Sequence, residues 1–153
     1  MTRLNRIPKA GAGRTGQNVQ HRGKVIQQAA VLAVWHGRIC LITSSSGKHW
    51  LVPKGHLERG DKLLKTAQQE AWEEAGLIGH ISPRPVGVYE YQKLDRLYRV
   101  VIFWMEVTHV QNNWPERKRR RRRWLSPGKA LPHISNSPLR RIVDAAFHGR
   151  RAA

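Results

Sequence analysis

A glycine-containing loop that leads into a glutamate-rich helix restricts the fold of this chain more than any other feature. Residues 62–75 are predicted to form the helix, since small and apolar residues recur at helical spacing and Gly76 can end it. The expected apolar stripe consists of Leu64, Ala67, Ala71 and Ala75. Glu73 and Glu74 follow Glu70 by three and four residues, so the three carboxylates should project from one side.

Three neighbouring carboxylates repel one another unless a cation lies between them. The plain alternative is a solvated acidic face, but this chain has only 10 acidic residues against 28 basic ones. The positions four residues after Glu73 and Glu74 hold Leu77 and Ile78, so neither carboxylate has a basic partner there. Carboxylate oxygens are ligands that Mg²⁺ prefers, together with water and substrate phosphates. The helix therefore favours a divalent-cation site.

The loop before the helix has the composition of a phosphate-binding loop. Gly55 stands between Lys54 and His56. Glycine lets backbone N–H groups approach phosphate oxygens, and a lysine adds a point charge. Such loops are common, so this one indicates a phosphate site only in combination with the helix.

Together the loop and the helix resemble the Nudix box. That pattern runs Gly, five residues, Glu, seven residues, Arg-Glu, an apolar residue, any residue, Glu-Glu, any residue, Gly and an apolar residue. The matching positions are Gly55, Glu70, Ala71, Glu73, Glu74, Gly76 and Leu77. Two positions depart, because Asp61 stands for the first Glu and Gln69 for the Arg. In the family these positions brace the loop against the helix, and here the brace is at best an Asp–Gln hydrogen bond.

The resemblance implies an α+β fold over residues 25–149, an α/β/α sandwich with a mixed β-sheet between helices. It also implies an enzyme, a Nudix pyrophosphohydrolase. Glu70, Glu73 and Glu74 would hold Mg²⁺, with Mn²⁺ as the alternative ion, and water would attack one phosphorus of a phosphoanhydride. Family members differ in which carboxylate takes the proton, so no base is assigned. Glu116 is either a further ligand or base, or an exposed counter-charge to its arginines.

The serine-rich turn at residues 44–46 resembles that of the diphosphoinositol polyphosphate phosphohydrolase branch, which also cleaves diadenosine polyphosphates. In that branch the turn and nearby basic residues grip phosphates. The candidate substrate-binding residues are Ser45, Ser46, Lys48, Lys54, Gly55, His56 and Arg96. The branch carries basic residues just before its first strand, where this chain has Gln27 and Gln28. The candidate replacements, each of which is otherwise a solvated loop charge, are Lys24, Lys93, Arg96 and Arg99.

The net charge of +18 attracts polyanions, although solubility alone is the simpler explanation. Its densest part is the run from Arg117 to Arg123. This run is either a self-repelling solvated loop, a contact for polyphosphate or RNA, or a nuclear-import signal. Trp114 and Trp124 flank it and are expected to pack in the core. The expected partner is a small polyanionic substrate, with RNA as the alternative, and the oligomeric state is open.

Short apolar runs predict the strands. A hairpin that turns at His36-Gly37 should join residues 29–35 and 39–42, and further strands are expected at 50–52, 85–92, 97–110 and 124–125. The strand at 97–110 should be central in the sheet, because its apolar run is continuous. Residues 112–123 should form a polar, basic loop. Ser137 is expected to cap a last helix, with Pro138 in its first turn.

The length of 153 residues fits a single domain. Residues 1–24 are rich in glycine and basic residues and are expected to form a flexible arm, while 150–153 form a tail. The lone cysteine, Cys40, should be a buried, inert thiol. No apolar run has the length of a membrane span, and the N-terminus lacks an apolar signal region, so a cytoplasmic protein without membrane contact is expected.

Three functions remain open from the sequence. The first is a pyrophosphohydrolase acting on a diphosphoinositol or dinucleoside polyphosphate. The second is an enzyme that removes pyrophosphate from RNA 5′ ends, which the net charge would favour. The third is a Nudix-fold module that binds nucleic acid without turnover, which Asp61 and Gln69 would favour and the intact glutamates oppose.

Overall fold

The structure is a computed structural model that describes residues 23–151, so the expected N-terminal arm lies almost entirely outside the described residues. Its elements in chain order are β1 (Ile26–Trp35), β2 (Arg38–Thr43), β3 (Trp50–Leu51), β4 (Lys54–His56), α1 (Leu63–Ala75), β5 (Leu77–Lys93), β6 (Arg96–Val110), β7 (Arg122–Leu125), α2 (Pro127–Ala130), the 3₁₀ turn η1 (Leu131–His133) and α3 (Ser137–Arg151). None of the described helices is long and apolar enough to span a membrane.

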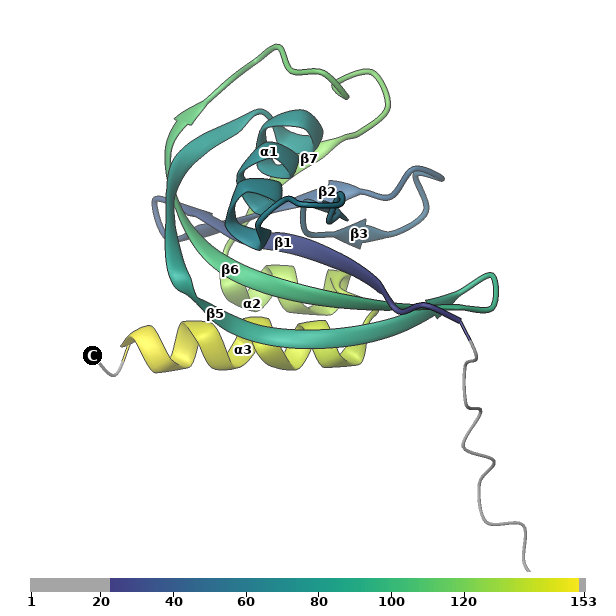
Figure 1. The fold of residues 1–153 in the computed structure, drawn as a ribbon. Coiled ribbons are helices and arrows are strands. Elements are labelled where there is room, and N and C mark those ends of the chain that lie inside the picture. Colours follow the sequence, from purple (N-terminus) through teal and green to yellow (C-terminus); the bar gives the residue numbers. More distant parts are fainter. Residues whose placement is uncertain (1–22, 152–153) are drawn as a thin grey trace, which may run out of the picture.

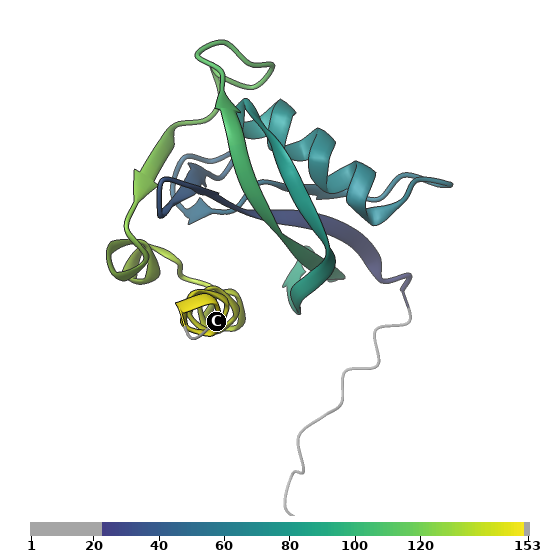
Figure 2. The ribbon, with the colours of Figure 1, turned by 90° about the vertical axis from the view of Figure 1, so that its left-hand side faces the viewer.

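The strands form one mixed sheet in the order β3-β2-β1-β6-β5, with β4 paired to β1 and β7 paired to β2. β1 and β6 run parallel, and the other pairs are antiparallel. α1 covers one face of the sheet, and α2 and α3 lie on the other (Figures 1 and 2). This arrangement confirms the expected α+β sandwich and the interior position of the long strand β6.

β1 is buried on both of its faces. Alternate residues pack with α3 and with α1, and these two sets are Ala30, Leu32 and Val34, and Ala29, Val31 and Ala33. A strand that is covered on both faces has no polar side, so its sequence is a continuous apolar run. Cys40 of β2 is likewise fully buried, and burial raises the pKa of its thiol to about 12, which confirms the inert thiol.

Turns and caps follow the local sequence. The expected hairpin forms between β1 and β2, and both of its turn residues, His36 and Gly37, have positive φ angles of 50° and 73°. Gly76 ends α1 in the left-handed region, with φ of 67°. The last helix differs from the expectation. Asn136 rather than Ser137 caps α3, because the Leu139 N–H donates to its Oδ1 at 2.9 Å.

Two further predictions were wrong. Leu64 is 37% exposed, and Leu63 packs against the core in its place, although the three alanines of the stripe are fully buried. β5 begins at Leu77 rather than at Pro85. Proline is tolerated in edge strands and at irregularities, and β5 is an edge strand with register shifts on both sides of Pro85. These irregularities hide the first half of β5 from a periodicity argument.

Candidate active site

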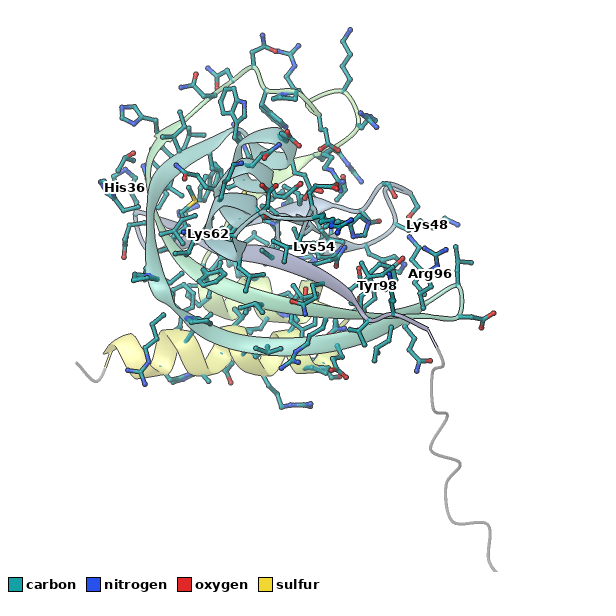
Figure 3. The ribbon with its side chains drawn as sticks, viewed as in Figure 1. His36, Lys48, Lys54, Lys62, Arg96 and Tyr98 are labelled. Carbon is teal, nitrogen blue, oxygen red and sulfur yellow. The ribbon has the colours of Figure 1, made fainter. Side chains whose placement is uncertain are left out.

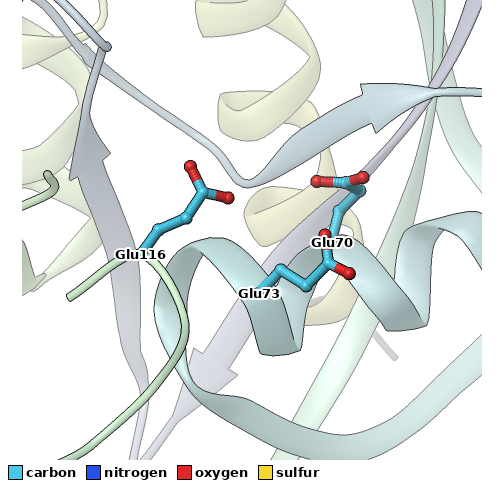
Figure 4. A group of neighbouring side chains, drawn as sticks. All are labelled: Glu70, Glu73 and Glu116. Atoms are coloured by element: carbon cyan, nitrogen blue, oxygen red, sulfur yellow. The ribbon is translucent and has the colours of Figure 1, made fainter.

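Three carboxylates from two separate segments meet at one point. Glu70 and Glu73 come from α1, and Glu116 comes from the segment that joins β6 to β7 (Figure 4). One oxygen of each lies within 4.8 Å of the other two. The Glu116 N–H donates to the Glu73 carbonyl at 3.0 Å, which fastens the segment to the helix. Glu116 therefore lies where it could serve as a further ligand or base, and it is also a counter-charge to Arg120.

Gly55 leaves room for the Glu70 carboxylate. A Cβ at this position would overlap the Glu70 side chain, so any larger residue would displace it. The pKa of Glu70 is raised to about 7, mainly by burial and further by the charges of Glu74, Glu73 and Glu116. Three oxygen donors in a field of excess negative charge fit Mg²⁺ or Mn²⁺.

Glu74 lies beside this group, but its oxygens have other partners. Its Oε1 accepts a hydrogen bond from Arg120 Nη2 at 2.9 Å, and its Oε2 accepts one from the Lys54 backbone N–H at 3.0 Å. Burial raises the pKa of Glu74 to about 7, against the opposing effects of Arg120 and the Lys54 N–H. The carboxylates whose oxygens lie within 4.8 Å of one another are therefore those of Glu70, Glu73 and Glu116. The assignment of Glu74 as a metal ligand stays a prediction.

The acidic group lines a cleft of about 460 Å³ that also contains Lys54, Gly55 and His56. Burial lowers the pKa of Lys54, whose ammonium donates to the Tyr91 hydroxyl at 3.2 Å. The Tyr91 hydroxyl in turn donates to Gln28 Oε1 at 2.7 Å. Lys54, Tyr91 and Gln28 thus form a connected polar network in the cleft. Figure 3 shows Lys54 near the middle of the molecule, among strands and loops.

A second cavity of about 490 Å³ adjoins the cleft. It is lined by Ser45 and Ser46 and shares Lys54, Tyr91 and Lys93 with the cleft. Lys48 and Arg96 line neither of these two cavities. Arg96 begins β6 at its turn with β5 (Figure 3). It lines a separate cavity with Lys24. The structure therefore brings together all the candidate substrate-binding residues except Lys48 and Arg96.

Asp61 and Gln69, the two departures from the box, each have a partner other than the hydrogen bond considered between them. Asp61 pairs with Lys65 at 3.2 Å, and Gln69 Nε2 donates to Glu73 Oε1 at 2.8 Å. Lys65 is four residues after Asp61 and offers it a charged partner, which a neutral amide cannot match. The expected Asp–Gln bond is therefore replaced by two separate contacts.

The basic run has alternating environments, because it enters β7. Arg122 pairs with Ile42 on the α1 side of the sheet, and it donates to the carbonyls of Ala75 and Gln111 at 2.6 and 2.9 Å. Arg121 and Arg123 point the other way, each over the ring of Trp50 at 5.6 and 5.7 Å. The solvated-loop interpretation therefore fits residues 117–119, which are exposed, but not Arg120 and Arg122, which have protein partners. A contact of the exposed arginines with polyphosphate or RNA stays a prediction.

Of the two flanking tryptophans, Trp124 packs against a core cluster as expected, whereas Trp114 belongs to neither core cluster of the described residues. The Trp114 Nε1–H donates to the Glu74 carbonyl at 3.0 Å, and its ring lies 4.2 Å from the Arg122 guanidinium. Trp124 packs against Trp35, with ring centroids 5.4 Å apart. Both rings thus hold the β6–β7 segment against the body of the protein.

Comparison with known proteins decides the family. A family model described as the NUDIX domain matches residues 25–146. The chain belongs to the Nudix family. Nudix hydrolase 12, mitochondrial, of Arabidopsis thaliana is 38% identical over 113 residues, which is 68% of this chain and 56% of that protein. Diphosphoinositol polyphosphate phosphohydrolase 3-alpha of Mus musculus is 35% identical over 95 residues, or 60% of this chain and 57% of that protein.

This Nudix chain spans little more than half the length of those curated relatives. Among solved structures, a C. elegans Ap4A hydrolase in a binary complex has a TM-score of 0.72 at 17% identity, covering 84% of this chain and all of that one. The E. coli ORF135 protein has a TM-score of 0.68 at 17% identity, covering 84% and 93%. These likenesses confirm the Nudix fold. Several plant relatives are named mitochondrial, and the cytoplasmic location stays a prediction.

Sequence reasoning missed four residues of this Nudix site. Gln28 is 4% exposed and bonds both Tyr91 and His56, whereas its position alone suggested only a missing basic residue. Tyr91 and Tyr98 stack with centroids 4.8 Å apart across β5 and β6. Counting back from the expected turn at residues 93–96 pairs these two tyrosines, so that signal was available. No signal within the basic run distinguishes Arg120 from its neighbours.

Proposed function

We propose that this Nudix chain is a metal-dependent phosphoanhydride hydrolase whose substrate is a diphosphoinositol polyphosphate or a dinucleoside polyphosphate. The observation that carries the proposal is the meeting of Glu70, Glu73 and Glu116 within 4.8 Å, in a cleft that also contains a lysine. Mg²⁺ held by these carboxylates would neutralise phosphate charge and make a water molecule easier to deprotonate.

The residues of the cleft divide the remaining work. Glu70, Glu73 and Glu74 of α1 would hold the cation, and Glu116 would add a ligand from the β6–β7 segment. Lys54 faces them from the β4 side and neutralises phosphate charge as it develops. The proton of the attacking water passes to a carboxylate of this site. The leaving phosphate retains the electron pair of the broken P–O bond.

The shape of the site supports an extended polyanion as the substrate. The cleft and the serine-lined cavity share Lys54, Tyr91 and Lys93, so one chain of phosphates can contact donors in both. The name of the mouse relative, a diphosphoinositol polyphosphate phosphohydrolase, supports the same class. The net charge of +18 favours any such anion.

A substrate panel tests this proposal. Purified protein would be assayed for release of phosphate and pyrophosphate, with Mg²⁺ or with a chelator. The panel would contain diphosphoinositol phosphates, diadenosine polyphosphates, nucleoside triphosphates, nucleotide sugars and 5′-triphosphorylated RNA. Mg²⁺-dependent cleavage of either of the first two classes, in preference to the others, is the expected result. Preferential cleavage of RNA, or tight RNA binding without any turnover, would contradict the proposal.

A further inference from the structure

Arg120 connects three elements through one guanidinium group. Its Nε donates to Glu116 Oε1 at 3.2 Å, its Nη2 donates to Glu74 Oε1 at 2.9 Å, and its Nη1 donates to the Thr43 carbonyl at 2.9 Å. The side chain is only 13% exposed. A planar guanidinium presents its donors in a fixed fork, so these contacts fix the relative positions of the β6–β7 segment, α1 and the end of β2.

The backbone around Arg120 is fastened on both sides. Ahead of it, the Glu116 N–H donates to the Glu73 carbonyl at 3.0 Å. After it, the Arg121 N–H donates to Thr43 Oγ1 at 2.9 Å, and the Thr43 N–H donates to the Arg121 carbonyl at 3.0 Å. The direction of the Arg120 side chain is therefore set by the fold and does not depend on a ligand.

We propose that Arg120 is a positioning residue for the acidic group, which holds Glu116 beside Glu70 and Glu73. A carboxylate has two oxygens, so Glu116 can accept from Arg120 and still offer an oxygen to a cation. Arg120 thereby keeps the Glu116 carboxylate within 4.8 Å of the carboxylate oxygens of Glu70 and Glu73. This inference rests on the proposed metal site.

A simple counter-charge function predicts the opposite effect on cation binding. A positive charge among carboxylates weakens their attraction for a metal ion, so its removal should tighten binding. Loss of a positioning contact instead lets Glu116 leave the group, and binding weakens. The sign of the change therefore distinguishes the two functions of Arg120.

Mn²⁺ affinity of the full chain, measured by the loss of the free-ion electron paramagnetic resonance signal, tests the inference. Arg120→Gln should weaken Mn²⁺ binding by roughly tenfold or more, as is typical when partners of metal ligands are removed. Arg119→Gln is the matched control, because it removes the same charge from an exposed neighbour, and it should leave the affinity within about twofold. Unchanged or tighter binding by Arg120→Gln would overturn the inference.

Coupling to Glu116 makes the test specific. Glu116→Gln should weaken Mn²⁺ binding, and the double variant with Arg120→Gln should bind no more weakly than Glu116→Gln alone, since both changes remove the same contact. Fully additive losses would contradict the proposal.

Arg120 does not line the cleft, so Arg120→Gln should also leave the KM for substrate at saturating metal within about twofold while kcat falls.

Arg120→Lys keeps the inference testable if Arg120→Gln does not fold, since removing one partner of a buried ion pair is destabilising. Lysine keeps the charge but cannot make three diverging contacts, so it should still weaken Mn²⁺ binding. Wild-type affinity in a folded Arg120→Lys variant would overturn the inference.

Glu73→Gln separates the inference from the proposed function. If wild type binds Mn²⁺, Glu73→Gln does not, and both Arg120 variants bind normally, only the inference fails. If wild type does not bind Mn²⁺, the proposed metal site fails as well.

Discussion

Glu70, Glu73 and Glu74 lie on one side of α1, yet each carboxylate has different neighbours. Glu70 lies against Gly55, Glu73 accepts a hydrogen bond from Gln69, and Glu74 is bound by Arg120 and by the Lys54 N–H. Glu74 is thus a buried ion-pair partner of Arg120, whereas neither Glu70 nor Glu73 has an ion-pair partner within residues 23–151. Their shared spacing along the helix does not reveal this difference.

Gly55→Ala tests the close approach of the loop to Glu70. The added Cβ would overlap the carboxylate, so it should displace Glu70, reduce Mg²⁺-dependent turnover and lower the free energy of unfolding by about 1–3 kcal/mol. Chemical denaturation and a turnover assay measure the two effects. Gly128→Ala is the control, since a Cβ there meets no atom within 4 Å. Equal behaviour of the two variants would show that Gly55 is not needed for space.

The raised pKa values predict how pH and metal act together on stability. In the fold the pKa values of Glu70 and Glu74 are about 7, above the ordinary value of 4.5, so folding favours their protonated forms. Without metal, these two groups should therefore reduce stability as pH rises from about 4.5 to about 7. A cation binds the deprotonated group, so Mg²⁺ should raise the melting temperature more at about pH 8 than at about pH 5.5. Thermal unfolding with and without Mg²⁺ measures this, and an equal rise at both pH values would contradict it.

At the scale of elements, the β5–β6 hairpin builds one wall of the cleft. Its strands pair Tyr91 with Tyr98, and the Tyr91 hydroxyl links Lys54 to Gln28. α1 builds the opposite wall, and its end at Gly76 lets the chain turn directly into β5. The β6–β7 segment then closes the site from a third direction. The cleft therefore depends on the relative positions of three elements.

Tyr91→Phe tests the link between Lys54 and Gln28. Removing the hydroxyl leaves two partly buried polar groups without that partner, so the free energy of unfolding should fall by about 1 kcal/mol or slightly more. Tyr98→Phe is a matched control from the same stack, because within residues 23–151 the Tyr98 hydroxyl makes no hydrogen bond. Urea denaturation of both variants measures the difference. A similar loss in both would mean that the Tyr91 hydroxyl network contributes little.

At the scale of the whole molecule, local patterns predict more than contacts between distant residues. The loop-and-helix spacing predicts the Nudix family, the glutamates and the presence of Gly55 because these features lie within one short segment. The buried runs of β1 and β6 predict a sheet covered on both faces. The sequence did not predict the contacts of Arg120 and Gln28, since these depend on which distant segment lies opposite. It also did not predict the partners of Asp61 and Gln69, which lie four residues along the chain.

If the carboxylates of α1 support Mg²⁺-dependent hydrolysis, the loss of one of them should nearly abolish turnover. Phosphate release from a diphosphoinositol or diadenosine polyphosphate would be measured for wild type, Glu73→Gln and Glu90→Gln. Glu90 is an exposed glutamate on β5 that lines neither the cleft nor the serine-lined cavity. Turnover should fall by roughly a hundredfold or more in Glu73→Gln and stay near wild type in Glu90→Gln. Normal turnover in Glu73→Gln, with the fold intact by circular dichroism, would contradict the account.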